Sequence, residues 1–255
     1  MIYAGLGLLA MAWAVVYPGT DYYIRWFHRS TVKRGPAAGK RLCLTFDDGP
    51  DPAVTPKLLD LLRQRGVPAV FFLIGAKAAQ HPELVKRIVA EGHEIGVHTH
   101  EHRHAYEMGP GRSRDSLRTG ARAVSQAAGV APVWFRPPWG AANLFQWLTA
   151  NRMGLRLVLW SANAQDWKAR TGPEGILARL RRRVKPGAVI VLHDAGGEPG
   201  APENTLRALP EIIAYFQAHG FRFASLRSLT GGWKDERSNV GVTPDRTGHR
   251  PEIPR

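Results

Sequence analysis

The chain has 255 residues, of which 44% are hydrophobic and 22% are charged, proportions that are ordinary for a globular protein. Its length suits a single large domain, such as an α/β barrel. The formal net charge of +14 favours anionic surroundings such as membrane headgroups or acidic wall polymers, although a role in solubility explains it equally well. No aromatic RNA-binding signature or zinc-finger spacing accompanies this charge, so we expect no nucleic-acid partner. A single cysteine, Cys43, excludes an intrachain disulfide.

The first thirty residues contain an apolar run with aromatic residues towards its end. Residues 2–17 carry no charge, and as a helix they extend about 24 Å, less than the roughly 30 Å of a hydrocarbon core. Aromatic residues of the kind found at membrane interfaces would complete the span: Trp13, Tyr17, Tyr22, Tyr23 and Trp26. The pattern predicts a membrane anchor over residues 1–30. A signal peptide is the alternative, because Ala10-Met11-Ala12 matches a cleavage pattern, although no Lys or Arg precedes the apolar run.

A short linker, predicted over residues 31–40, leads into a regular alternation of elements. Apolar strands are predicted over residues 42–46, 69–74, 94–98, 133–136, 155–160, 188–193 and 221–224. Helices are predicted over residues 55–65, 81–91, 114–128, 143–152, 174–184 and 204–219. This alternation predicts parallel β/α units in a barrel-like or doubly wound sheet, within one domain over residues 41–230. Residues 231–255 contain few large apolar side chains, which predicts a disordered tail.

Two adjacent aspartates end the first predicted strand, in the stretch Thr45-Phe46-Asp47-Asp48-Gly49-Pro50. Like charges at this spacing repel, and partial burial adds to the cost, so a cation must lie close to them. A solvated turn is the simpler interpretation of these residues alone. Polar residues at other predicted strand ends favour an active site instead, because those ends meet at one rim of a β/α barrel. They are His98, Arg136, Asp166, His193 and Asp194.

A histidine tract follows the third predicted strand, with histidines at positions 98, 100, 102 and 104. In a helical turn His98 would face His102, and His100 would face His104. Either pair, together with one aspartate, gives two imidazoles and one carboxylate, a set that suits zinc with an open coordination position. A histidine-rich surface loop with incidental metal affinity is the alternative.

Two further strand ends carry candidate residues. The run Arg136-Pro137-Pro138-Trp139-Gly140 predicts a rigid loop, because each proline fixes its own φ and restrains the residue before it. Such a loop could hold a guanidinium against a carboxylate and present a backbone N–H to a substrate. His193 ends a buried strand, and Asp166 from the neighbouring strand end could polarise its imidazole. Trp139 and Trp167 suit stacking on a sugar, although a place in the barrel core is the commoner role of tryptophan.

Together these stretches resemble the five motifs of polysaccharide deacetylases, carbohydrate esterase family 4, also known as the NodB-homology domain. The motifs occur in the order typical of that family: Thr45-Phe46-Asp47-Asp48-Gly49-Pro50, His98-Thr99-x-x-His102, Arg136-Pro137-Pro138-Trp139-Gly140, Asp166-Trp167 and Val191-Leu192-His193-Asp194. The resemblance covers roughly residues 40–229. It implies a single catalytic domain with a distorted (β/α)7 barrel. It also implies metal-dependent removal of N-acetyl groups from amino-sugar glycans such as peptidoglycan or chitin.

The resemblance also implies a role for each matching residue. Asp48, His98 and His102 are the expected metal ligands. Asp47 is the expected catalytic base, and Arg136 is expected to orient it. His193 is the expected acid, with Asp166 tuning it, while Trp139 and Trp167 are expected to bind substrate. Zinc is the expected metal, with cobalt, manganese or nickel as alternatives.

Two positions depart from the family pattern. Trp139 stands where the third motif usually has Tyr, which matters little if the functional group is the backbone N–H. Asn163 stands where the fourth motif usually opens with an aspartate. The missing charge is expected to affect the preference among glycans more than the chemistry.

Two other functions remain open at this point. One is a catalytically inactive glycan-binding module tethered to the envelope, and the other is an amide hydrolase acting on a lipid-linked amino sugar or a non-sugar amide. We expect single-pass attachment with an extracytoplasmic catalytic domain, with secretion as the alternative and with no protein partner evident. The basic residues that follow the apolar run would face the cytoplasm by the positive-inside rule, so the orientation stays open.

Overall fold

One sheet of eight strands forms the centre of the computed structural model, which describes residue 7 and residues 10–231. Every strand pair within the sheet is parallel, and the order is β5-β4-β3-β2-β1-β7-β6, with β8 beside β1. The strands are β1 (Arg41–Asp47), β2 (Ala69–Leu73), β3 (Glu94–Val97), β4 (Trp134–Phe135), β5 (Arg156–Leu157), β6 (Ala162–Asn163), β7 (Ala188–His193) and β8 (Arg222–Phe223). The predicted α/β barrel is therefore confirmed.

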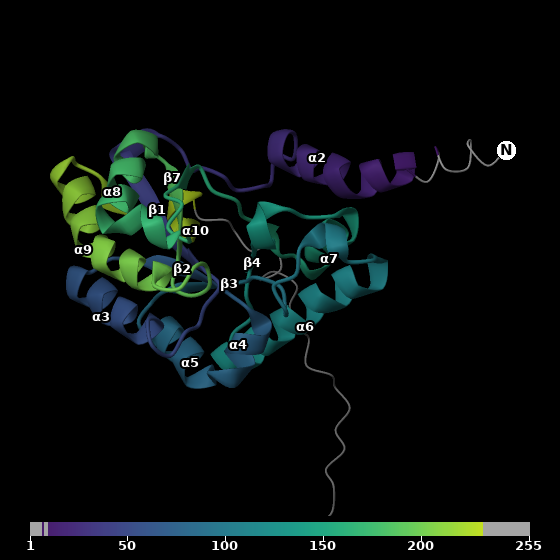
Figure 1. Ribbon diagram of the computed structural model, residues 1–255, viewed down its shortest axis with the longest axis horizontal. Coiled ribbons are helices and arrows are strands. Elements are labelled where there is room, and N and C mark those ends of the chain that lie inside the picture. The colour runs from purple at the N-terminus through teal and green to yellow at the C-terminus, as the bar shows by residue number, and fades with distance from the viewer. Residues whose placement is uncertain (1–6, 8–9, 232–255) are drawn as a thin grey trace, which may run out of the picture.

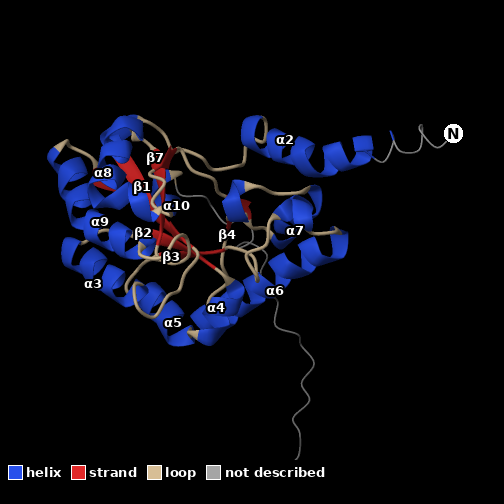
Figure 2. Ribbon diagram, viewed as in Figure 1, coloured by secondary structure: helices blue, strands red, loops and turns tan. Residues whose placement is uncertain are grey.

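Helices surround the strands, as Figures 1 and 2 show. They are α2 (Thr20–Trp26), α3 (Thr55–Arg65), α4 (Gly75–Gln80), α5 (Pro82–Ala90), α6 (Pro110–Ala128), α7 (Leu144–Met153), α8 (Gly172–Arg183), α9 (Ala201–Ala218) and α10 (Leu226–Leu229). The bounds of α3 and β7 are those predicted. Helix α4 was not predicted, because its sequence Gly-Ala-Lys-Ala-Ala-Gln has no apolar periodicity. The strand predicted over residues 155–160 is shorter than expected, and β6 follows as a separate strand.

The central strands are buried on both faces, which explains their continuous apolar sequence. All five residues of β2 and all but the first residue of β1 are buried. One face of these strands packs on the surrounding helices, and the other face, with Cys43, Val70 and Phe72, fills the interior. In the register between β1 and β7, Asp47 pairs with His193. The parallel register therefore brings polar strand ends to one rim.

The segment ahead of the sheet packs against the barrel. A single π-helical turn, Val15–Gly19, continues into α2, which lies along the outside of the molecule at the top of Figure 1. Ile24 of α2 is only 1% exposed and belongs to a core cluster with residues of α6, α7 and β5. In the predicted linker, Val32 bridges to Val158 and Arg34 to Ala188. The boundaries at residues 30 and 40 stay a prediction, but these contacts tie both segments to the barrel.

Within residue 7 and residues 10–231, no helix has the length and hydropathy needed to cross a membrane. Most of the first nine residues of the predicted anchor lie outside the described part of the chain. The same is true of the tail predicted over residues 231–255, apart from Gly231.

The buried position of Ile24 leads to a stability prediction. Replacing Ile24 by Ala should lower the free energy of unfolding by about 2–5 kcal/mol, because it leaves a cavity in the core cluster. Urea denaturation measures the change. Tyr22→Ala on the same helix is the control, and it should change stability little, because Tyr22 is 59% exposed. Equal stability of the Ile24 variant and the wild type would show that α2 does not dock on the barrel.

Candidate active site and metal centre

The polar strand ends open into one cavity of about 540 Å³. Its lining includes Asp47, Asp48, Ile74, Lys77, His98, His102, Trp139, Trp160, Asn163, Trp167, Val191, His193, Gly196 and Gly197. Two predicted site residues, Arg136 and Asp166, are fully buried and contact lining residues from beneath. The structure thus brings all nine predicted site residues to one place.

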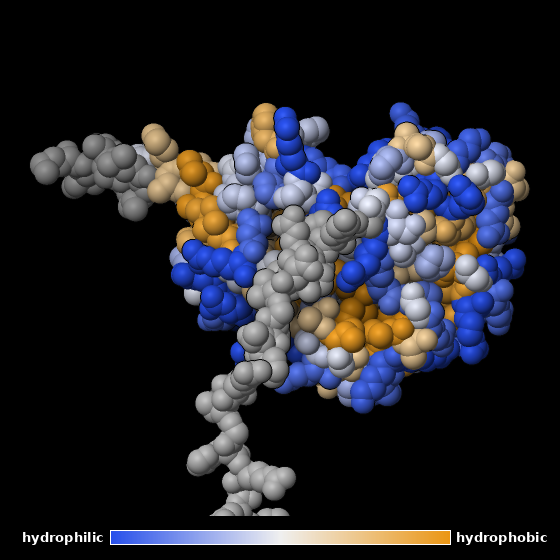
Figure 3. All heavy atoms as spheres, turned by 180° about the vertical axis from the view of Figure 1, so that it is seen from behind, coloured by the Kyte–Doolittle hydropathy of each residue, from blue (hydrophilic) through white to orange (hydrophobic). Residues whose placement is uncertain are grey.

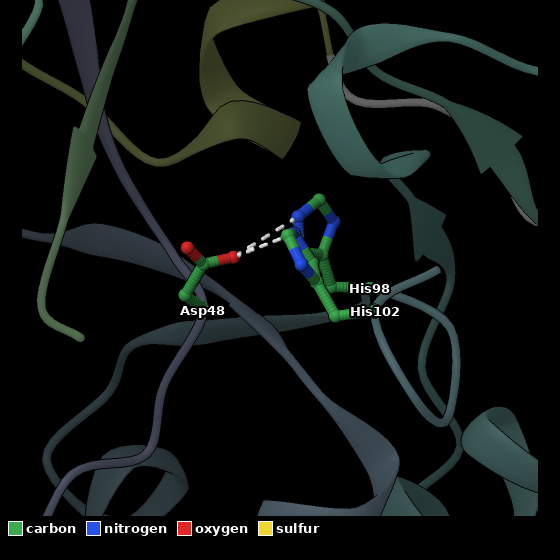
Figure 4. Close-up of side chains that lie close together, drawn as sticks. All are labelled: Asp48, His98 and His102. Carbon is green, nitrogen blue, oxygen red and sulfur yellow. Dashed lines mark ion pairs between the residues drawn. The ribbon is translucent and has the colours of Figure 1, made fainter. Parts of the chain in front are cut away.

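Asp48, His98 and His102 form a cluster that fits a metal ion (Figure 4). The Asp48 Oδ1 atom lies 3.4 Å from His98 Nε2 and 3.0 Å from His102 Nε2. This oxygen is buried and, within the described part of the chain, accepts no hydrogen bond of good geometry. A buried carboxylate oxygen facing two ring nitrogens is costly without a shared cation. The donor set suits a divalent metal such as zinc, with positions left open.

The tautomer of His98 follows from its surroundings. His98 Nδ1 lies 2.6 Å from the Arg136 carbonyl oxygen, which can only accept a hydrogen bond. Nδ1 therefore carries a proton, and Nε2 is the ring nitrogen that faces Asp48 Oδ1. Burial disfavours the charged form of Asp48, but the interactions with His102 and His98 outweigh it and hold the pKa of Asp48 well below its usual range. The carboxylate is therefore ionised, as a metal ligand must be.

The histidine pair comes together in a different way from the one predicted. His98 and His102 do lie together, but residues 98–104 form no helical turn. The expectation that a helical i, i+4 spacing brings them together was therefore wrong. Instead, Thr99 and His102 both have positive φ, 62° and 52°, and the loop folds back on itself. His98 is fixed directly by β2, because its N–H donates to the Leu73 carbonyl at 2.8 Å. The backbone turn, and not a helix face, makes the pair.

The other two histidines of the tract lie apart from the cluster. His104 Nδ1 accepts a hydrogen bond from the Tyr106 N–H at 3.3 Å, and the ring packs beside Trp139. His100 Nδ1 is buried against Gly75 of α4. Neither side chain belongs to the group that could hold a metal ion.

These positions predict which histidines hold the metal. His98→Ala and His102→Ala should each abolish stoichiometric metal binding, because an open site with three protein ligands cannot spare one. His100→Ala and His104→Ala are the matched controls and should retain about one metal per chain. Metal analysis of the four purified variants distinguishes the pairs. A metal-free His100 or His104 variant, beside a loaded His98 variant, would overturn the assignment.

Asp47 and Arg136 form a buried ion pair beside the metal cluster. Arg136 Nη1 donates to Asp47 Oδ1 at 2.6 Å and to Thr45 Oγ1 at 2.7 Å. Its other nitrogens donate to the carbonyls of Val158 and Leu159, and its guanidinium stacks 4.0 Å from the Phe72 ring centre. Burial lowers the pKa of Arg136, and the charge of Asp47 counteracts this. The guanidinium is the cation that the adjacent aspartates require.

His193 and Asp166 form the second polar pair. Asp166 accepts from the His193 backbone N–H at 2.7 Å and lies 3.0 Å from His193 Nδ1, while Thr205 donates to the same carboxylate. Burial alone would lower the pKa of His193, but Asp166, aided by Asp47 and Asp48, raises it to about 9. The imidazole is therefore protonated at neutral pH, and its Nε2 has no hydrogen-bond partner among the described residues.

This pair predicts a change in pH dependence. Asp166→Asn removes the charge that raises the pKa of His193, so the protonated form is lost at a lower pH. The alkaline limb of the kcat profile should move down by about one pH unit or more. Profiles of the variant and wild type measure the shift. Asp115→Asn, at an exposed position of α6, is the control and should leave the pH profile unchanged. If the profile of the Asp166→Asn variant does not shift, His193 is not the titrating group.

The loop that carries Trp139 has an unusual backbone. Trp139 has φ 55° and Gly140 has φ 69°, so two consecutive residues are left-handed. A positive φ is rare for a bulky residue and marks a position held by its surroundings. The Trp139 side chain is 57% exposed over the cavity, close to the His102 ring. Asn163, the other departure from the family pattern, also lines the cavity, and its side chain accepts the Gln165 N–H.

Several cavity residues were not predicted from the sequence. Lys77 donates from α4 to the Asp48 carbonyl at 2.8 Å, and nothing in its local sequence indicated this. Gly196 leaves room for Asp48, because a Cβ there would lie 2.5 Å from Asp48 Oδ2. The sequence feature that could have indicated Gly196 is the pair of adjacent glycines, Gly196 and Gly197, two residues after Asp194. Asp194, by contrast, is fully buried and does not line the cavity. Burial raises the pKa of its carboxyl group to about 7, and the Thr55 hydroxyl donates a hydrogen bond to it at 2.5 Å.

Comparison with known proteins places the chain in a family. Residues 34–158 match the family model described as polysaccharide deacetylase. A chitooligosaccharide deacetylase from Bradyrhizobium is 39% identical over 206 residues, which cover 76% of this chain and 93% of the relative. The chain belongs to the polysaccharide deacetylase family. A peptidoglycan-N-acetylglucosamine deacetylase from Bacillus cereus is 37% identical over 192 residues, 74% of this chain and 88% of the relative.

Solved structures of this family agree with the fold. The Bc1960 peptidoglycan N-acetylglucosamine deacetylase aligns with a TM-score of 0.74 and 34% identity, over 79% of this chain and 92% of that chain. A family 4 pseudoenzyme from Bacillus anthracis aligns with a TM-score of 0.72 and 25% identity, over 79% of this chain and 69% of the other. The family fold therefore occurs both in enzymes and in a pseudoenzyme, so the side chains of the site decide the activity.

Proposed function

We propose that this polysaccharide deacetylase hydrolyses N-acetyl groups from amino-sugar glycans built of N-acetylglucosamine. One observation supports it most: a single cavity holds a metal-binding cluster, an Arg-paired carboxylate and a protonated imidazole. Hydrolysis of an unactivated amide needs a base, an oxyanion stabiliser and an acid for the amine. The names of the relatives give the substrate class, chitooligosaccharides or peptidoglycan.

The base in this proposal is Asp47, and the metal ligands are Asp48, His98 and His102. When bound, a divalent ion supplies Lewis acidity, which acidifies water and polarises a carbonyl. Asp47 accepts a proton from the attacking water. Arg136 holds this carboxylate by a 2.6 Å hydrogen bond from below, which leaves its other oxygen available to the cavity.

The oxyanion donor and the acid come from opposite strand ends. The Trp139 backbone N–H makes no hydrogen bond to any other residue of the described chain, so it is available to an oxyanion in the cavity. His193 then donates its Nε2 proton to the departing amine, and Asp166 stabilises the imidazolium before transfer. The exposed Trp139 indole and Trp167, whose ring lies 5.6 Å from His193, would contact sugar faces.

The inactive glycan-binding module is disfavoured by these side chains. A module that only binds glycans needs neither a buried base held by arginine nor a histidine whose pKa lies near 9. Both features cost stability and suit proton transfer.

We also propose attachment of the domain to a membrane surface through its N-terminal segment, with the catalytic domain outside the cytoplasm. Large apolar side chains of this segment stay exposed: Met11, Trp13, Val15, Tyr22, Tyr23, Trp26 and Phe27. Figure 3 shows apolar atoms gathered there, next to the grey N-terminal residues. Arg29 and Lys33 follow them, so the surface combines interfacial aromatics with cations. This position keeps a lipid-linked amino sugar as the second candidate substrate.

His193→Ala tests the proposed reaction. The variant should keep its metal and lose about 10²–10⁴-fold in kcat, because only the general acid is removed. Acetate release is measured from chitooligosaccharides, peptidoglycan fragments and lipid-linked amino sugars in parallel, with added zinc. His219→Ala, an exposed histidine at the end of α9, is the matched control. A wild-type protein that releases no acetate from any of the three substrates would contradict the proposed function.

A further inference from the structure

The N-terminal helical segment contacts the loop that carries Trp139. Arg25 of α2 donates from Nη2 to the Gly140 carbonyl at 2.7 Å. Arg25 is itself held by Asp21, one turn earlier, through a 2.8 Å ion pair. Asp21 also reaches the loop, because its Oδ1 accepts the Ala142 N–H at 3.4 Å. One ion pair of α2 thus binds the catalytic loop at two backbone groups.

The loop depends on such outside support. Its own hydrogen bonds, from Gly140 to Pro137 and from Ala141 to Pro138, leave Trp139 in a left-handed conformation that bulky residues avoid. The turn is confined between two neighbours, because a Cβ on Gly140 would lie 2.7 Å from the Trp160 ring and 3.3 Å from Arg25 Nη2. Trp160 also lines the cavity, whereas Arg25 is not among the residues that line it.

Aromatic side chains make a second connection between the same segment and the same loop. The Tyr17 hydroxyl donates to the Met108 carbonyl at 3.1 Å, and its ring lies 6.0 Å from that of Tyr106. Tyr106 packs edge-on against His104 at 4.9 Å, and His104 lies 5.3 Å from Trp139. The segment therefore supports both the backbone of the loop and the indole of Trp139.

We infer that Arg25 and Asp21 are positioning residues, which hold the Trp139 loop so that its backbone N–H faces the reacting carbonyl. This inference rests on the proposed function, in which that N–H stabilises the oxyanion. Docking of the N-terminal segment then sets the catalytic rate, although none of its residues touches the substrate. The same segment that would attach the domain to a surface therefore also holds the loop that completes the proposed active site.

A purely structural role for the Arg25 pair predicts a lower melting temperature when the guanidinium is removed, whereas a positioning role does not. The Arg25 side chain is 34% exposed, and a partly exposed i, i+4 ion pair contributes little to global stability. Removing the guanidinium should therefore change the melting temperature little. An oxyanion donor acts mainly in the transition state, so its displacement lowers kcat and leaves KM nearly constant.

Arg25→Met is the decisive variant, because it keeps the aliphatic stem and removes the guanidinium. With zinc bound and a chitooligosaccharide as substrate, we expect kcat to fall by about tenfold or more, with KM within about twofold of wild type. Metal content and melting temperature should be unchanged. Arg25→Lys should recover part of the rate, because an ammonium can still donate to the Gly140 carbonyl. Arg118→Met, at an exposed position of α6, is the control and should match wild type.

Hydrogen exchange of the full-length protein gives a readout that does not require turnover. The peptide over residues 136–143 should exchange faster in Arg25→Met and Asp21→Asn, while peptides from β2 and α9 exchange as in wild type. Unchanged exchange in this loop, or an unchanged kcat, overturns the inference. Unfolding of both Arg25→Met and Arg25→Lys also overturns it, because the role would then be general support. An inactive wild type would defeat the proposed function alone, since the exchange result still decides whether Arg25 holds the loop.

Discussion

The site depends on one buried guanidinium. The Arg136 side chain is fully buried, and it donates four hydrogen bonds, to the Asp47 carboxylate, a threonine hydroxyl and two carbonyls from the chain after β5. A charge at this depth is tolerable only when every neighbour is in place. The backbone carbonyl of the same residue fixes the tautomer of His98. Arg136, directly after β4, therefore orients both Asp47 and His98, the base and one metal ligand of the proposed mechanism.

The two adjacent aspartates have separate roles because the chain turns between them. Asp47 ends β1 and faces Arg136, whereas Asp48 has φ 74° and faces the two histidines. His193 lies on β7, directly beside β1, with a pKa raised by Asp166. A carboxylate held by arginine and an imidazole kept protonated at neutral pH are complementary groups for acid–base catalysis.

The N-terminal segment lies ahead of the part of the chain that matches the family model. The match begins at residue 34, yet α2 lies ahead of it, where Ile24 joins a core cluster and Arg25 binds the loop that carries Trp139. Its outward side carries exposed aromatic side chains, and its inward side carries the ion pair. In the proposed function, this short helix therefore connects the surface that attaches the domain with the loop that carries the oxyanion donor.

The sequence by itself determined the barrel and located the nine proposed site residues, because buried strands and polar strand ends leave a local pattern and the family motifs fall on those ends. Continuous apolar runs such as β7 are readable, since strands buried on both faces carry apolar residues throughout. Only the tertiary structure decided how His98 meets His102, since that depends on left-handed backbone at Thr99 and not on helical spacing. It alone revealed Lys77 beneath Asp48, and Arg25 on Gly140, 115 residues away in the chain. Contacts of this kind join residues that share no local periodicity, so their position is set by the packing of whole elements.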